Sequence, residues 1–82
     1  MARYYFDLRD GDQLAVDEEG MELPTMQAVQ VEAARSLVDI AKHAIWTKAA
    51  TILGHRMAIE VRNESGAVMQ AKFIFALERY QR

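Results

Sequence analysis

The sequence predicts an α+β fold in which a four-stranded, mostly antiparallel sheet packs one face against a single long helix. Apolar residues alternate with polar ones near both ends of the chain, which is the period of half-buried strands. Between these regions, apolar residues recur at spacings of three and four, which is the period of an amphipathic helix. The element order is therefore ββαββ, and one helix over one sheet face lets both layers bury their apolar sides.

Length and composition indicate one domain, spanning residues 1–82, because the chain has no internal repeat and no Gly/Ser linker. The absence of cysteine excludes disulfides, thiolate catalysis and cysteine-based zinc sites. No run approaches the roughly 20 apolar residues of a membrane span, and the first residues lack the apolar core of a secretory signal. We therefore expect a cytoplasmic protein that does not bind membranes.

The first strand is predicted over residues 3–9, where apolar and polar side chains alternate. Residues 10–13 are typical of a hairpin turn, because their glycine accepts a positive φ and their aspartates bond their own backbone. A short second strand is expected over residues 14–16. The acidic residues 17–20 are predicted to form a solvated turn that leads to Pro24.

A long helix is predicted from Thr25 to about Ala50, because no proline or glycine interrupts this stretch. The hydroxyl of Thr25 can cap its first turn by accepting a backbone N–H. The apolar stripe of this helix consists of Met26, Val29, Ala33, Leu37, Ile40 and Ala44. A second apolar row widens this stripe beyond what one sheet face usually requires. It consists of Val31, Ala34, Val38, Ala41 and Ile45.

Alternation returns after Gly54, which predicts a third strand with Met57, Ile59 and Val61 facing the helix. Residues 63–66 are predicted to form a compact turn. A fourth strand follows, and its inward side chains are Met69, Ala71, Phe73, Phe75 and Leu77.

The residues that could support catalysis or bind a metal lack the spacing that such chemistry requires. His43 and His55 lie too far apart in the sequence to share one zinc ion through one helix face. The hairpin acids, Asp7, Asp10 and Asp12, do not follow the pattern of a calcium loop. No serine lies in a nucleophile elbow, and the glycines do not form a phosphate cradle. We therefore predict a protein that is not an enzyme and holds no cofactor or metal.

The end of the helix is the first candidate interaction surface. A helix of about 39 Å exceeds a seven-residue strand of about 23 Å, so its last turns are predicted to extend beyond the sheet. These turns contain Ile45 and Trp46, and residues of this kind are frequent interface anchors. We expect a homodimer formed through this segment; the alternative is a chain that folds back over it.

The acidic beginning of the chain is the second candidate surface. Residues 1–24 contain seven acidic and two basic side chains, for a net charge of −5, whereas residues 25–82 contain five and eight, for +3. A regulatory or antitoxin-like module that binds a basic protein is therefore the alternative function. Its candidate contact residues are Asp7, Asp10, Asp12, Asp17, Glu18 and Glu19.

Nucleic-acid binding is disfavoured, although one aromatic side chain faces the open side of the predicted sheet. Tyr5 shares that side with Arg3 and Arg9, a combination that can stack bases. Acidic residues, including Asp7 and Glu60, lie on the same side and repel phosphate. We retain Tyr5 as a candidate contact for a protein partner, because the same side also carries apolar residues.

Residues 3–11, Arg-Tyr-Tyr-Phe-Asp-Leu-Arg-Asp-Gly, together with the acidic stretch 17–24 and strand 57–62, resemble a family of short proteins common in alphaproteobacteria. That family is grouped as a domain of unknown function, so the resemblance implies a bacterial domain without established catalytic residues. The apolar residues 45–53 depart from it. The element order is also similar to that of HicB-type antitoxin domains, but their proline-glycine-cysteine turn is missing here.

Overall fold

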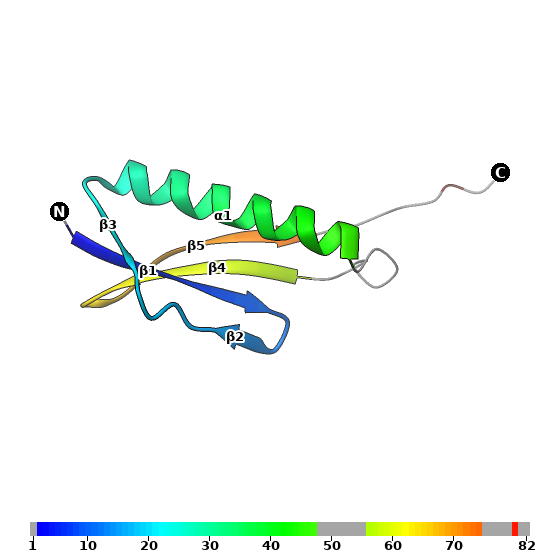
Figure 1. Ribbon diagram of the computed structural model, residues 1–82, viewed down its shortest axis with the longest axis horizontal. Coiled ribbons are helices and arrows are strands. Elements are labelled where there is room, and N and C mark those ends of the chain that lie inside the picture. The colour runs from blue at the N-terminus through cyan, green and yellow to red at the C-terminus, as the bar shows by residue number, and fades with distance from the viewer. Residues whose placement is uncertain (1, 48–55, 75–79, 81–82) are drawn as a thin grey trace.

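The computed structural model describes residues 2–47, 56–74 and 80, and for residues 44–47 it describes the backbone. The strands form one sheet in the order β2-β1-β4-β5, and β3 pairs with β1 outside this path. Helix α1 lies across one face of the sheet, as Figure 1 shows, which confirms the predicted α+β architecture. The elements are β1 (Ala2–Asp10), β2 (Gln13–Ala15), β3 (Met21–Leu23), α1 (Met26–Thr47), β4 (Arg56–Asn63) and β5 (Gly66–Ile74).

Strand β1 organises the sheet because it has partners along both edges. One edge pairs with β4 in antiparallel register, so that Asp7 lies opposite Glu60 and Arg9 opposite Ala58. The other edge pairs first with β3 and then with β2. The sequence predicts four strands, whereas the structure has five, because residues 21–23 form β3 and are not part of a connecting turn. Three residues are too few to show a period, and β3 lacks the adjacent hairpin turn that indicates the equally short β2.

Both predicted hairpin turns are present. Gly11 has a φ of 62°, a left-handed conformation that favours glycine, in the tight turn between β1 and β2. At the other hairpin, the side-chain oxygen of Asn63 accepts a hydrogen bond from the Ser65 N–H at 2.8 Å. This contact holds the turn between β4 and β5 and is the local bonding that makes asparagine common in turns.

Helix α1 begins where its cap predicts. The Thr25 hydroxyl accepts a hydrogen bond from the Ala28 N–H at 3.1 Å, which satisfies a donor that the first turn leaves free. Within the described residues the helix extends to Thr47, and the predicted end near Ala50 lies outside them.

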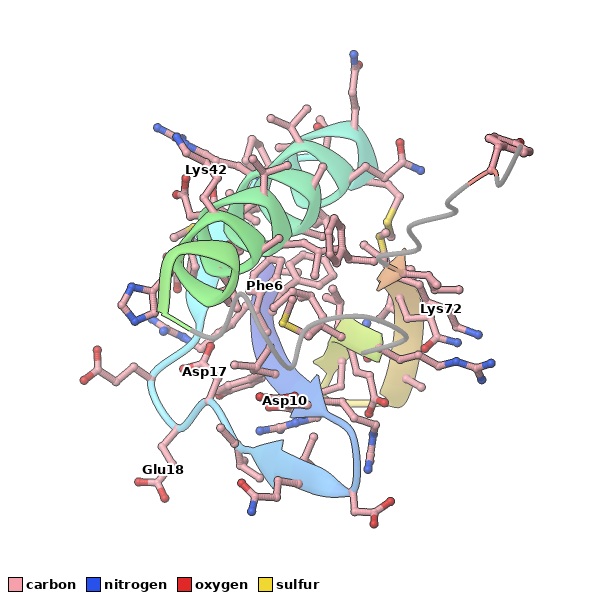
Figure 2. All side chains as sticks on the ribbon, turned by 90° about the vertical axis from the view of Figure 1, so that its right-hand side faces the viewer. Phe6, Asp10, Asp17, Glu18, Lys42 and Lys72 are labelled. Atoms are coloured by element: carbon pink, nitrogen blue, oxygen red, sulfur yellow. The ribbon has the colours of Figure 1, made fainter. Side chains whose placement is uncertain are left out.

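The core lies between α1 and the sheet. The helix contributes residues at four-residue spacing, and the strands contribute alternate residues, as the two periods require. Phe6 lies beneath the helix in Figure 2 and packs against this cluster. The buried cluster consists of Val29, Ala33, Leu37, Ala41, Met57, Ile59 and Val61.

The second apolar row of the helix has a different environment. Val31 is 60% exposed and Val38 is 56% exposed, whereas Ala41 of the same row is buried in the core, so the sheet covers only part of this row. Met26, predicted in the first row, is also exposed. Predictions that concern Phe75, Leu77 and the side chains of residues 44–53 lie outside the described residues.

Candidate interaction surfaces

A buried carboxylate lies on the sheet face opposite the helix. The Asp7 side chain points to the side that the alternation predicts to be open, yet Asp7 is only 6% exposed. The Arg62 Nε donates a hydrogen bond to Asp7 Oδ2 at 2.9 Å, and the Asp17 backbone N–H donates to Oδ1 at 2.9 Å. Both oxygens of Asp7 are therefore satisfied by partners from two distant segments.

Asp17 attaches the segment between β2 and β3 to the edge of β1. Its Oδ2 accepts a hydrogen bond from the Phe6 N–H at 3.1 Å, in place of a neighbouring strand. Its Oδ1 accepts from the N–H groups of Glu19 and Gly20 at 3.1 and 3.2 Å. Partial burial raises the pKa of Asp17, but these three N–H groups and the charge of Arg62 outweigh it, so the pKa lies below its ordinary value.

Arg62 joins three parts of the chain. Besides its ion pair with Asp7, it donates a hydrogen bond from Nη2 to the Asp17 carbonyl oxygen at 2.9 Å. Its guanidinium carbon also lies 4.4 Å from the ring centre of Tyr5, within cation–π range. Tyr5 therefore stacks with an arginine of its own chain, and this half-buried ring is not an open platform for bases.

Gly20 lies close to the Tyr5 ring. Its φ is 72°, and a Cβ added there would lie 2.8 Å from Tyr5 Cε1. Only glycine fits this position without displacing the ring. The segment of residues 16–20 therefore packs closely against β1, and it covers Asp7.

A second cross-strand ion pair lies further along the same face. The Arg9 Nε donates to Glu60 Oε2 at 2.7 Å, from β1 to β4. This hydrogen bond and the charge of Glu60 raise the pKa of Arg9 above its ordinary value, so its positive charge persists. Both side chains are more than one-third exposed, whereas the Asp7 side chain is buried.

The two edges of the sheet differ in length. One edge is formed by β2 and β3, which contain three residues each and are separated by residues 16–20. Short and interrupted strands of this kind are poor templates for another chain. The opposite edge is β5, a continuous strand of nine residues that pairs only with β4 among the described residues.

Alternation identifies which backbone groups of β5 face outward. The Phe6 N–H points to the outer edge of β1, so the odd-numbered residues of β1 face β4. Their partners on β4 are even-numbered, and the odd-numbered residues of β4 therefore face β5. Because Ile59 lies opposite Ala71, the backbone groups of Gln70 and Lys72 face the open edge.

The predicted contact residues of the acidic segment and of the helix end divide into three groups. Asp7 and Asp17 are held by hydrogen bonds within the chain, and Asp10 is half-buried and has an interaction partner. Asp12, Glu18 and Glu19 are exposed. Ile45 and Trp46 belong to α1, and their side chains lie outside the described residues.

The alternation of β4 places Arg62 on the open sheet face, but this pattern does not identify its role. The sequence does place an acidic side chain, Asp7, and a basic one, Arg62, on the outward faces of two predicted strands. Only the register, which pairs Tyr5 with Arg62, shows that Asp7 and Arg62 can meet. The same holds for Lys72, which the register places beside Ala58.

Within the part of the chain that the structure describes, no three histidine or acidic side chains gather in a way that could hold a metal ion. In the same residues, no helix is long and apolar enough to cross a membrane.

A family model matches most of this chain. The model of a family described as Domain of unknown function (DUF6894) matches residues 3–74, which is most of the chain. No curated protein and no solved structure matches the chain. The chain belongs to this family, as the opening motif and the strand over residues 57–62 indicated.

Proposed function

We propose that this member of a family of unknown function is a non-enzymatic interaction domain that self-associates through strand β5. The observation that carries this proposal is the open edge of β5, which spans nine residues. Its outward N–H and C=O groups can pair with those of another strand. A second copy supplies a strand of the same length and composition.

Antiparallel pairing of two β5 strands is compatible with their charges. Lys72 is the only charged residue of β5. If the pairing is centred on Gln70, Lys72 lies opposite Val68 of the partner subunit, so the two lysines do not face each other. A twofold axis perpendicular to the sheet relates the copies, and the dimer closes without exposing a further β5 edge.

Pairing in this way also covers apolar surface. Ile74 is 61% exposed at the end of β5. The two sheets become one, and both helices lie on the same face, because antiparallel neighbours keep their faces aligned. The buried cores of the two copies stay separate, so the dimer forms from folded monomers.

A proline at the open edge tests the proposal. In Gln70→Pro the lost N–H is one that faces away from β4, so the pairing of β4 with β5 keeps its hydrogen bonds. The matched control is Leu14→Pro, since Leu14 also faces outward, but on the short edge strand β2. Both variants are first compared with the parent chain by circular dichroism.

Sedimentation equilibrium then gives the mass of each protein. The proposal predicts a dimer for the parent chain and for Leu14→Pro, and a folded monomer for Gln70→Pro. A parent chain that stays monomeric up to high concentration contradicts the proposal. A Gln70→Pro variant that dimerises as well as the parent also contradicts it.

The alternative, binding of a basic protein through the acidic segment, has less support. Asp7 and Asp17 use their oxygens within the chain, so fewer carboxylates remain for a partner. Asp12, Glu18 and Glu19 are the exposed candidates in this segment, and the two glutamates are adjacent. Capture of a basic protein that is lost in the variant with both glutamates changed to lysine would favour this alternative.

A further inference from the structure

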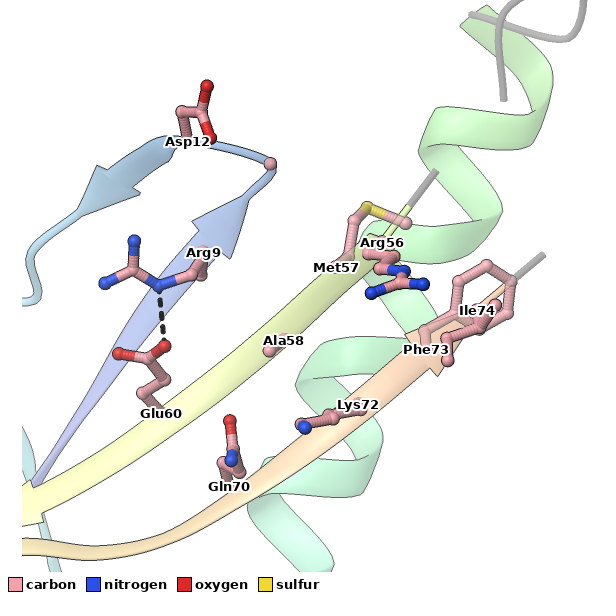
Figure 3. A pocket seen from close by; sticks show the side chains of 11 residues that line it. Arg9, Asp12, Arg56, Met57, Ala58, Glu60, Gln70, Lys72, Phe73 and Ile74 are labelled. Carbon is pink, nitrogen blue, oxygen red and sulfur yellow. Dashed lines mark hydrogen bonds and ion pairs between the residues drawn. The ribbon is translucent and has the colours of Figure 1, made fainter. Parts of the chain in front are cut away.

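A hollow of about 430 Å³ lies on the sheet face opposite the helix, near the open end of β5. Ala58 lies within it, and its small side chain stands between longer ones on the neighbouring strands (Figure 3). Its partner on β1 is Arg9, and its partner on β5 is Lys72. Along β4, Arg56 and Glu60 lie two residues before and after it, on the same face.

The charges around the hollow do not cancel. Glu60 is neutralised by Arg9 at 2.7 Å, and Asp12 lies at the far side, where it also interacts with the charge of Arg9. Arg56 and Lys72 form no ion pair within the described part of the chain. Three cations (Arg9, Arg56 and Lys72) and two carboxylates (Asp12 and Glu60) line the hollow, so its described side chains carry one excess positive charge.

The remaining lining complements these cations. Gln70 adds an amide that can donate hydrogen bonds, and Figure 3 shows its side chain beside Lys72 on the same face. Ile74 adds an exposed apolar wall next to Arg56, its partner across the strands. A ligand with an anionic head and a small apolar body fits this combination.

We propose that this hollow binds the phosphate or carboxylate group of a small ligand, with Arg56 and Lys72 as its charge partners. An arginine can bind two oxygens of one such group with its planar fork, and a lysine adds a compact charge. The small side chain of Ala58 leaves space for the anionic group beside Arg56 and Lys72. The Gln70 amide donates a hydrogen bond to an oxygen of that group that neither cation binds. The site opens on a sheet face and not on the β5 edge, although Gln70 and Ile74 belong to the strand that pairs in the proposed dimer.

Titration by two-dimensional NMR tests the site in the full chain. Sodium phosphate and sodium succinate are added separately to the labelled protein, and sodium chloride of equal ionic strength serves as the reference. The site predicts saturable shifts that are confined to the amides around Ala58 and Lys72. Saturation with phosphate alone identifies a phosphorylated ligand, and saturation with succinate alone identifies a carboxylate.

Charge-removing variants separate this site from general attraction. Lys72→Gln and Arg56→Gln are each expected to weaken binding about tenfold, because each removes one charged hydrogen bond. Arg35→Gln is the control, since it removes the same charge from the helix, where the side chain is 72% exposed. Ala58→Leu fills the hollow and is expected to abolish saturation while the chain stays folded.

Three results would overturn the proposal. The first is a set of linear shifts that chloride reproduces. The second is equal weakening by Arg35→Gln and Lys72→Gln, which indicates attraction by net charge alone. The third is unchanged binding in a folded Ala58→Leu variant, which places the anion elsewhere.

Discussion

Asp7 and Arg62 form an ion pair of 2.9 Å between β1 and β4, although 55 residues separate them in the sequence. The pair does more than join two strands. Asp7 also accepts the N–H of Asp17, and Arg62 also donates to the Asp17 carbonyl. The two side chains therefore fasten the segment between β2 and β3 to the sheet.

Replacement of Asp7 by alanine is predicted to destabilise the fold by about 2 kcal/mol, because it leaves Arg62 and the Asp17 N–H without their acceptor. The value stays moderate because the Arg62 side chain is 37% exposed and water can solvate it. Urea denaturation measures the change. Glu60→Ala is the control, since it breaks a more exposed pair on the same face, and an equal loss in both variants would contradict the special role of Asp7.

Acid is predicted to weaken the fold through Asp17. The pKa of Asp17 is lower in the folded chain than in the unfolded chain, where it is about 3.9. Its contribution to stability is therefore complete above that value and is lost as the pH falls through the folded pKa. Urea titrations from neutral pH to strong acid are expected to show a shallower loss in Asp17→Asn than in the parent. Glu18→Gln, at the exposed neighbour, is expected to keep the parent profile, and an unchanged acid profile in Asp17→Asn would refute this assignment.

Gly11 and Gly20, two of the three glycines with a positive φ among the described residues, are predicted to respond differently to alanine. Gly11→Ala costs about 1 kcal/mol, because the backbone alone is strained and no atom lies within 4 Å of the new Cβ. Gly20→Ala costs at least about twice as much, because its Cβ also meets the Tyr5 ring at 2.8 Å. Thermal unfolding of both variants measures the difference. Equal losses would show that residues 16–20 do not pack against Tyr5.

Neighbouring alanines on the helix test its orientation. Ala33 is fully buried and Ala34 is exposed. Ala33→Leu is predicted to destabilise the fold by about 1 to 3 kcal/mol through overpacking. Ala34→Leu is predicted to change it by less than about 0.5 kcal/mol, because leucine is also a good helix former. Chemical denaturation that reverses this order would place the other side of the helix against the sheet.

Most of the fold could be predicted because its elements follow simple periods. The alternation around Phe6 and Ile59 and the four-residue spacing from Val29 to Leu37 each identify an element and its buried side. Thr25 also identified the beginning of the helix, because a cap is a local feature. Strand β3 could not be predicted, since its three residues show no period and no tight hairpin turn precedes them, as one precedes the equally short β2.

The sites could be predicted less well, because they depend on contacts between distant residues. An acid at the position of Asp7 is ordinarily solvated, and it is buried here only because residues 16–20 cover it. The hollow over Ala58 requires the register that places Arg9 and Lys72 on either side of it. Alternation gives the face of each side chain but not its neighbour on the next strand.

Amide hydrogen exchange as a function of protein concentration reports on the pairing of two β5 edges. If the edges pair, the N–H groups of Gln70 and Lys72 become more protected as the concentration rises, since they face the open edge. The outward N–H of Leu14, on the short edge, should exchange at the same rate throughout. Exchange of the Gln70 and Lys72 amides that stays fast at every concentration would contradict the account.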